Sequence, residues 1–204
     1  VYRLIKKNDP LASGVDLVIS YLYWRRILDP LIKLGRRGCI NFHPAPLPDY
    51  KGRAGYNTAI LDGRKTFGVS AHFIDSEKFD SGPIIKVLRF AMDPARETVY
   101  SLMAKTNEKL FKLFCMTMDL FLAKERIPTK SNRGGLYLTG GELEKIKMVI
   151  PRRDSLAVID KKIRAFFFPP HSGAHIFIRG KKYTLLNEEM LKIAAELIGK
   201  RRDE

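Results

Sequence analysis

The sequence predicts an α/β fold, with an open sheet and a small α+β extension toward the C-terminal end. Short apolar runs of strand length alternate with helical patterns as far as about residue 126. One of these runs ends in a polar pair, Asn41 and His43, and three prolines follow within the next five residues. Beyond residue 126 the pattern changes to short helices around a single hairpin.

The length of 204 residues fits one α/β domain with a small addition. The two cysteines, Cys39 and Cys115, argue against a disulfide framework and for a reducing compartment. Both stand in apolar runs, so we expect them to be buried as small hydrophobic side chains. No apolar run reaches the length of a membrane span and no signal-peptide pattern opens the sequence, which predicts a soluble, cytoplasmic protein.

The formal net charge of +15 makes nucleic acid a possible partner, although not the favoured one. Residues 1–120 hold 19 basic and 12 acidic residues, and residues 121–204 hold 18 and 10. The excess is therefore spread along the chain. An anionic small molecule, such as a nucleotide-linked sugar or a polyglutamylated folate, would be attracted equally well, so charge alone does not decide.

The elements of the first part follow from apolar runs, turn residues and helical spacing. Polar residues bound a buried, parallel-type strand at 16–20, and Gly35 closes a helix at 26–34. Leu102, Leu110, Leu113 and Thr117 stand near helical spacing in a long amphipathic helix. The full order is a strand at 1–7, a turn at 8–10, a strand at 16–20, a helix at 26–34, a core strand at 38–43, a helix at 55–61, strands at 66–75 and 84–90, and a helix at 98–124.

The second part begins with a polar, glycine-bearing linker at 128–135. A helix is expected at 155–168, and prolines and glycine make a hard turn at 169–173. Two short apolar runs, 174–178 and 182–186, are joined by Arg179-Gly180-Lys181 and predict a β-hairpin, after which a last helix spans 188–199. We therefore predict a core domain at residues 1–126 and a small α+β extension at residues 127–204.

The chain is organised around residues 39–52. Asn41 and His43 are two residues apart on a strand, so their side chains share a face and can point into one cavity. Pro44, Pro46 and Pro48 then prevent helix formation and strand pairing, which leaves a stiff loop as far as Gly52. Open α/β sheets bind their ligands at such a strand end.

These residues resemble the signature of the formyltetrahydrofolate-dependent formyltransferases. Asn41-Phe42-His43-Pro44 resembles the family's N-x-H element, and the segment from Leu47 to Gly52 resembles its L-P-x-[FYW]-[KR]-G element. Gly68–Asp75 and Phe79–Ile85 are similar to its later strand, loop and D-[ST]-G element, with Asp80 at the position of the catalytic aspartate. The resemblance spans about residues 15–125 and implies a Rossmann-like formyltransferase core without the family's first strands.

The resemblance also implies the chemistry, a folate-dependent one-carbon transfer. His43 suits the role of general base toward the attacking amine, because an unperturbed imidazole titrates near neutral pH. Asn41 can donate amide hydrogens to the developing oxyanion. Asp80 would orient the imidazole, stabilise its charged form and position a water for proton relay. Neither a metal nor a covalent enzyme intermediate is required.

Two loops of the family hold the co-substrate, N10-formyltetrahydrofolate, largely through backbone groups. The amine-bearing substrate would lie over the proline loop, where basic side chains can meet its phosphates. The implied cofactor-binding residues are Tyr23, Trp24, Arg25, Arg26, Ile27, Asp75 and Phe79, and the implied substrate-binding residues are Lys51, Arg53, Tyr56 and Asn57.

Other histidines and aromatic residues favour structural roles. His72 stands within a strand and is interpreted as a structural histidine, and His171 and His175 as exposed or packing residues beside a turn. Phe166-Phe167-Phe168 is interpreted as core. For Trp24, a core position and a wall of the cofactor site are about equally supported.

The acceptor favoured by the sequence is a nucleotide-linked amino sugar. The segment after residue 125 is short, and Gly55-Tyr56-Asn57 resembles the sugar-acting members. One alternative is a methionyl-tRNA formyltransferase, which would need a concentrated basic face and a full barrel. Another is a non-catalytic binding fragment that keeps the formyltransferase fold. A homodimer is possible.

Overall fold

The structure, a computed structural model, describes residues 14–23, 25–124 and 126–200. The strand expected at 1–7, the turn at 8–10 and Trp24 lie outside the described residues. The chain divides into two compact units. The first comprises Val1–Gly55, Phe67–Phe90 and Lys105–Tyr137, and the second comprises Tyr56–Thr66, Ala91–Ala104 and Leu138–Glu204. The division at residue 126 stays a prediction.

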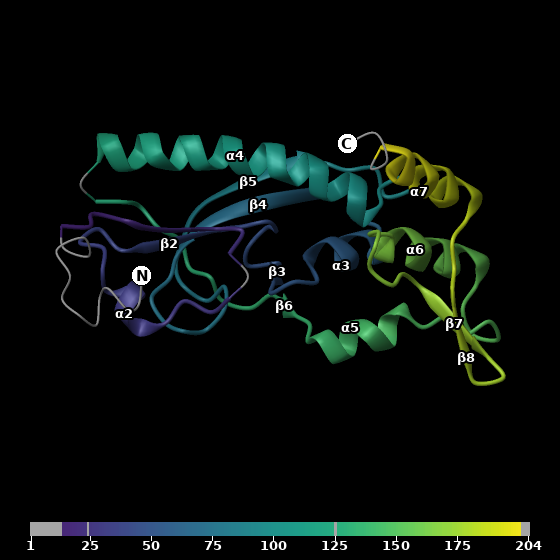
Figure 1. Cartoon of the computed structure of the whole chain (residues 1–204). Coiled ribbons are helices and arrows are strands. Elements are labelled where there is room, and N and C mark those ends of the chain that lie inside the picture. Colours follow the sequence, from purple (N-terminus) through teal and green to yellow (C-terminus); the bar gives the residue numbers. More distant parts are fainter. Residues whose placement is uncertain (1–13, 24, 125, 201–204) are drawn as a thin grey trace. The chain divides into compact units, whose positions relative to one another are not determined.

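The first unit is built on a four-stranded sheet with the strand order β1-β2-β4-β5 (Figure 1). β1 is parallel to β2, and β2 is antiparallel to β4, so the sheet is mixed. Ser20 of β1 lies opposite Asn41 of β2, which in turn lies opposite His72 of β4. The strands are β1 (Val18–Tyr21), β2 (Cys39–His43), β4 (Thr66–Phe73) and β5 (Ile84–Ala91).

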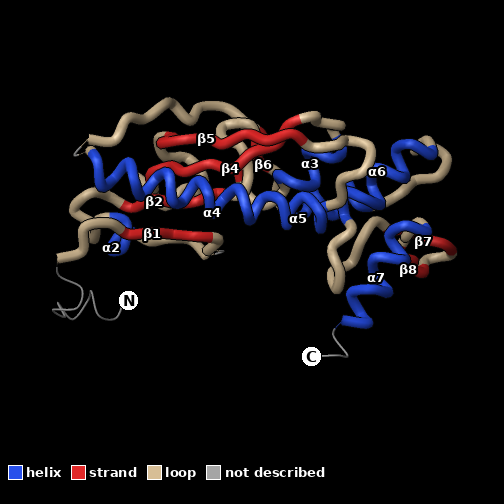
Figure 2. Tube along the Cα trace, turned by 90° about the horizontal axis from the view of Figure 1, so that it is seen from above, coloured by secondary structure: helices blue, strands red, loops and turns tan. Residues whose placement is uncertain are grey.

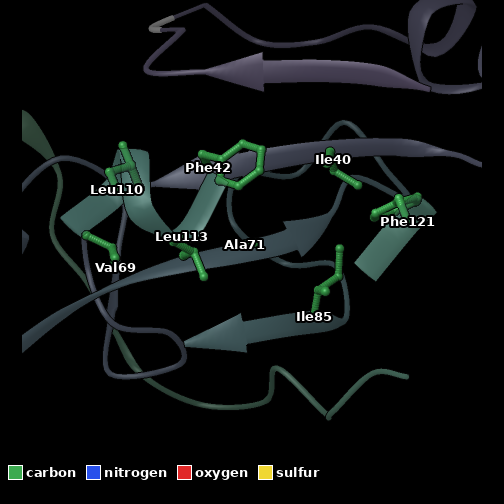
Figure 3. Packing of buried hydrophobic residues seen from close by; sticks show 8 residues of the cluster. All are labelled: Ile40, Phe42, Val69, Ala71, Ile85, Leu110, Leu113 and Phe121. Carbon is green, nitrogen blue, oxygen red and sulfur yellow. The ribbon is translucent and has the colours of Figure 1, made fainter. Parts of the chain in front are cut away.

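The core of the first unit lies between this sheet and the long helix α4 (Val99–Ala123). Figures 1 and 2 show α4 running along the strands. Figure 3 shows how side chains from the strands and from α4 meet. Successive strand residues point to opposite faces, so the residues between these core positions face away from α4. The cluster consists of Ile40, Phe42, Val69, Ala71, Ile85, Leu110, Leu113 and Phe121.

Local sequence explains where α4 begins and which of its faces is buried. Thr98 caps its start, because the Thr98 hydroxyl accepts from the Ser101 amide at 3.0 Å and the Ser101 hydroxyl accepts from the Thr98 amide at the same distance. Buried residues recur three or four positions apart, which places one stripe of the helix against the sheet. Within the first unit this stripe consists of Thr106, Leu110, Leu113, Thr117 and Phe121.

Short elements connect the sheet. Two-residue strands β3 (Tyr50–Lys51) and β6 (Leu136–Tyr137) pair in parallel, which the sequence did not predict. The helix expected at 26–34 is wrong in extent, because α2 spans only Asp29–Ile32. Pro30 lacks the amide hydrogen that a longer helix would use at this position and is tolerated only in a first turn. α3 (Gly55–Leu61) matches the prediction.

Two expectations about burial are wrong. β1 was expected to be buried, but Ile19 and Tyr21 are exposed and only Ser20 is fully buried. β1 is the outer strand of the sheet in the described part of the chain, so its side chains have strand neighbours on one side only. Cys39 is buried as expected, whereas Cys115 is exposed because it lies on the outer side of α4.

The second unit has its own core, which consists of Val149, Ile163, Phe167, Ala174 and Met190. Its hairpin was predicted, and Arg179-Gly180 forms the two-residue turn with positive φ at both positions. Its elements after residue 138 are α5 (Gly140–Lys147), α6 (Leu156–Phe166), β7 (His175–Ile178), β8 (Lys181–Thr184) and α7 (Glu188–Lys200). No helix among the described residues is both long and apolar enough to cross a membrane.

Candidate functional site

The polar face of the sheet carries the predicted pair. Asn41 and His43 alternate with the core residues Ile40 and Phe42, so both point away from α4, as expected for residues two apart on a strand. His72 of β4 lies directly opposite Asn41 and points to the same face. The site thus lies where β2 ends, beside Ser20, the one fully buried residue of β1.

Asp80 completes the cluster from the loop between β4 and β5. Its carboxylate Oδ1 lies 3.5 Å from His43 Nδ1, 3.4 Å from His72 Nε2 and 3.5 Å from Asn41 Nδ2. The other oxygen, Oδ2, accepts a hydrogen bond from the Gly52 amide at 2.8 Å. Asp80 is 8% exposed and has a φ of 48°, a left-handed conformation that is strained for a residue with a side chain.

Asn41 is held in one orientation. The Ser20 hydroxyl donates to Asn41 Oδ1 at 2.8 Å, so the amide nitrogen faces the other side. That nitrogen lies 3.2 Å from His72 Nε2. The ring of His72 is fixed in turn, because its Nδ1 is 2.8 Å from the Phe73 carbonyl, to which it donates when protonated. The amide hydrogens of Asn41 are therefore directed toward Asp80 and His72.

His43 is nearly inaccessible, with 4% of its surface exposed. Its Nε2 lies 3.0 Å from the Tyr50 carbonyl, which leaves Nδ1 facing Asp80. Burial lowers the pKa of His43, since it penalises the charged ring, and the nearby His72 acts in the same direction. Asp80 and the Tyr50 carbonyl oppose this shift without cancelling it. The neutral imidazole, able to accept a proton, is thus favoured.

Opposing effects act on Asp80. Burial by itself would raise the pKa of this carboxyl group, but the ring of His72, the charge on His43 and the Gly52 amide together outweigh burial. They hold the pKa of Asp80 at about 2, below the usual 3.8. The carboxylate is therefore ionised over the whole neutral range.

The proline loop is pinned to the sheet by Ser70 of β4. The Ser70 hydroxyl accepts from the Leu47 amide and donates to the Ala45 carbonyl, both at 2.8 Å. The Leu47–Pro48 peptide bond is cis. This loop delivers both the Tyr50 carbonyl, which faces His43, and the Gly52 amide, which binds Asp80.

A pocket opens beside the cluster. Asn41, His72 and Asp80 line it, whereas His43 is not among the described residues of its wall. Two of the lining residues contact each other, because the Arg26 guanidinium lies over the Phe79 ring, 5.4 Å from the ring centroid. Of the residues predicted to hold the co-substrate, those in the lining are Tyr23, Arg25, Arg26, Ile27 and Phe79, while Asp75 is exposed next to Ile74 and Ser76, which line it.

The predicted substrate-binding residues are dispersed. Lys51 Nζ donates to the Asn132 carbonyl at 3.0 Å, so it contributes to holding the fold in this structure. Arg53 is exposed. Tyr56 and Asn57 belong to the second unit, where Asn57 Nδ2 donates to the Ala165 carbonyl at 2.7 Å. Their substrate roles stay predictions.

Sequence reasoning missed two members of the cluster, His72 and Ser20. His72 was interpreted as a structural histidine, yet it lies 3.4 Å from Asp80 and lines the pocket. A signal for it exists, because Ser70 and His72 alternate with Val69, Ala71 and Phe73 and thus mark a polar face. Ser20 carried no comparable signal, since its role depends on the register with Asn41.

In the part of the chain that the structure describes, no group of three or more histidine, cysteine, aspartate or glutamate side chains is placed to hold a metal ion. The polar cluster instead combines hydrogen-bond donors, an imidazole and an ionised carboxylate beside a pocket. Such a set can accept a proton and stabilise a developing oxyanion.

The formyl transferase family model matches residues 7–117, which is more than half of the chain and includes every member of the cluster. This chain belongs to the formyl transferase family. The matched region contains the sheet from β1 to β5, the proline loop and most of α4.

Two curated relatives show the breadth of this family. A GDP-perosamine N-formyltransferase from Brucella melitensis is 30% identical over 169 residues, which is 82% of this chain and 63% of the relative. A methionyl-tRNA formyltransferase from Pseudothermotoga lettingae is 33% identical over 182 residues, which is 87% of this chain and 56% of the relative. The chain thus spans about three fifths of the length of these relatives.

A solved structure supports the fold. The N-formyltransferase from Helicobacter canadensis, in complex with folinic acid and dTDP-3-aminofucose, has a TM-score of 0.66 at 21% identity. The likeness covers 92% of this chain and 71% of that one. At this identity it shows the fold alone, and it confirms the prediction of a formyltransferase-like α/β fold.

Proposed function

We propose that this protein is an N-formyltransferase that moves a formyl group from N10-formyltetrahydrofolate to the amine of a nucleotide-linked amino sugar. The observation that carries the proposal is the clustering of Asn41, His43 and Asp80 at the end of β2, beside a pocket. Residues predicted to hold the co-substrate line the same pocket, including Tyr23 and Phe79.

Asn41 acts on the oxygen of the formyl group. The amine lone pair forms a bond to the formyl carbon while the C=O π electrons move onto oxygen. Asn41 Nδ2 then gives up its long contact with Asp80 Oδ1, at 3.5 Å, and donates this hydrogen bond to the oxyanion. Ser20 orients this donor. Its hydroxyl donates a hydrogen bond to Asn41 Oδ1, which keeps the amide nitrogen on the side that faces Asp80 and His72.

His43 accepts the proton that the amine nitrogen loses. Its Nδ1 faces Asp80, so a proton taken up there lies between the imidazole and an ionised carboxylate, where the positive charge is stabilised. Because Asp80 lines the pocket and His43 does not, a water bound by Asp80 carries the proton inward. When the C=O bond reforms, the bond from carbon to N10 breaks and the proton returns to N10, which releases tetrahydrofolate.

The choice of an amino sugar rests on the similarity to sugar-acting relatives. The GDP-perosamine N-formyltransferase shares 30% identity with this chain. The Helicobacter canadensis protein, whose fold is similar, was solved with dTDP-3-aminofucose. The net charge of +15 suits an anionic acceptor of either kind, a nucleotide-linked sugar or a tRNA, and does not distinguish between them.

Methionyl-tRNA is the second candidate acceptor. It is favoured by one specific observation, the 33% identity to the methionyl-tRNA formyltransferase of Pseudothermotoga lettingae. The solved Helicobacter canadensis structure of similar fold contains dTDP-3-aminofucose, a nucleotide-linked amino sugar. We therefore rank the nucleotide-linked sugar first.

The test is a direct comparison of acceptors. The full chain is incubated with formyl-labelled N10-formyltetrahydrofolate and, separately, a panel of GDP- and dTDP-linked amino sugars or initiator methionyl-tRNA. Label in an N-formylated sugar, together with release of tetrahydrofolate, is the expected result. Label in methionyl-tRNA alone would replace the sugar by the second candidate, and no transfer to any acceptor despite bound folate would contradict the proposal.

A further inference from the structure

Residues 128–135 were expected to form a polar linker, but residues 130–137, which we call the strap, contact both loops of the site. Its start pairs with β5 through two hydrogen bonds between Ile84 and Lys130, at 2.9 and 2.8 Å. Its end, β6, pairs with β3 of the proline loop, and the Leu136 amide donates to the Asp49 carbonyl at 2.9 Å. The strap therefore joins the two loops that build the polar cluster.

Asn132 is the central contact of this strap. Its Nδ2 donates to two backbone carbonyls in the Asp80 turn, that of Asp80 at 3.0 Å and that of Gly82 at 2.9 Å. The backbone carbonyl of Asn132 accepts a hydrogen bond from Lys51 Nζ at 3.0 Å. Since Asn132 is 8% exposed, these bonds are shielded from water. One residue thus links the Asp80 turn to the proline loop.

The backbone of the turn that contains Asp80 is constrained at two residues, Asp80 and Gly82. Asp80 adopts a left-handed φ of 48°, a conformation that is disfavoured for a residue with a side chain. Gly82 presses against the sheet so closely that a Cβ there would lie 2.0 Å from the Phe73 carbonyl oxygen. The two carbonyls bound by Asn132 belong to these two constrained residues, Asp80 and Gly82.

We propose that Asn132 is a positioning residue, which holds the Asp80 turn so that the carboxylate faces His43 and His72. The amide does not touch the reacting groups. It acts through Asp80, whose Oδ1 lies at 3.4 to 3.5 Å from three partners, distances at which a small displacement changes each interaction. For catalysis this inference rests on the proposed formyl transfer, but the placement of Asp80 can be measured without it.

The test compares Asn132→Leu with a matched control, Thr117→Val. Leucine is close to asparagine in shape but cannot donate to the two carbonyls. Thr117→Val also removes a buried side-chain donor, because the Thr117 hydroxyl donates to the Leu113 carbonyl at 2.7 Å. Thr117 lies on α4, on the other face of the sheet from the site. A second variant, Asn132→Ser, replaces the first if leucine prevents folding.

Two readouts separate positioning from mere stability. The first is the NMR titration of the His43 ring, in a protein with only four histidines. Because Asp80 raises the pKa of His43, displacement of the carboxylate should move the titration of His43 to lower pH in the Asn132 variants and not in Thr117→Val. The second is single-turnover formyl transfer, expected to fall by roughly tenfold or more while folate affinity is retained.

The outcomes are distinct. A shifted His43 titration with lower transfer supports the role of Asn132. An unchanged titration in a folded Asn132 variant, with transfer equal to that of Thr117→Val, overturns it. If wild-type protein transfers no formyl group, the proposed function fails, and the titration alone still decides whether Asn132 positions Asp80.

Discussion

At the residue scale, one carboxylate organises the site. Asp80 is buried, ionised and strained, and its two oxygens contact groups from β2, β4 and the proline loop. Each contact stabilises the charged form, which offsets the cost of burial. Asn41 and His43 were identified from the sequence because their spacing and the loop after them are local features. Ser20 was not, since its contact with Asn41 depends on strand register, whereas His72 carried a local signal in the polar alternation along β4.

The first residue-scale prediction concerns Ser20. Replacing Ser20 by alanine removes the hydroxyl that fixes Asn41 Oδ1, so the amide can rotate and its nitrogen no longer faces the cluster in every molecule. We expect the rate of single-turnover transfer to fall by roughly tenfold with unchanged folate affinity. Ser20→Thr keeps the hydroxyl and serves as the control. Equal rates for Ser20→Ala and wild type would contradict this account of Asn41.

The second residue-scale prediction concerns pH. The folded-state pKa of Asp80, about 2, is below its usual 3.8, so the ionised carboxylate stabilises the fold fully above pH 3.8. This contribution is lost as the pH falls through about 2. The stability difference between wild type and Asp80→Asn should therefore shrink as the pH falls from 3.8 toward 2.

Urea unfolding of both proteins over a pH series measures this difference. The lowered pKa of His43 weakens both proteins as the pH falls below 6.5, because the unfolded chain binds that proton more readily. Because Asp80 raises the pKa of His43, the His43 contribution also differs between the two proteins below pH 6.5, and the Asp80 effect is therefore read from the change below pH 3.8. A stability difference that grows as the pH falls from 3.8 to 2 would show that the carboxylate destabilises the fold.

At the element scale, the strap and the proline loop fit together closely. Gly135 has a φ of 84°, and a Cβ there would lie 1.6 Å from the Pro48 carbonyl oxygen. Gly134 has a similar φ of 76° but no atom within 4 Å of the added Cβ. Two neighbouring glycines thus differ in packing while sharing a left-handed backbone.

This contrast gives the element-scale prediction. Gly134→Ala should cost about 1 kcal/mol of unfolding free energy, from backbone strain alone. Gly135→Ala should cost about 3 kcal/mol, because the backbone of the proline loop must also move. Chemical denaturation of the two variants measures the difference. Equal losses would mean that the strap is free to lift from the loop.

Elements were predictable wherever their cause is local. The hairpin followed from Arg179-Gly180 between apolar runs, and α4 from helical spacing after Thr98. The helix at 26–34 was overestimated because Pro30 restricts it to one turn. The strap was interpreted as a linker because the partners of Asn132 lie about fifty residues away in the sequence, and no local pattern marks them.

At the scale of the whole molecule, the reaction class and the acceptor depend on different parts of the chain. The polar cluster and its pocket lie entirely within the first unit and within the region matched by the family model. The motifs that predicted the family, within residues 41–52 and 68–85, lie in this region. The acceptor could not be predicted in the same way, because relatives that share this region act on different amines.

The most direct test of the central claim is single-turnover transfer of labelled formyl by wild type, His43→Ala and Asp80→Asn, with folate affinity measured in parallel. We expect wild type to form the labelled N-formyl sugar, and both variants to lose at least about a hundredfold in rate while they still bind folate. Near-native transfer in either variant would contradict the claim that Asn41, His43 and Asp80 carry out the reaction.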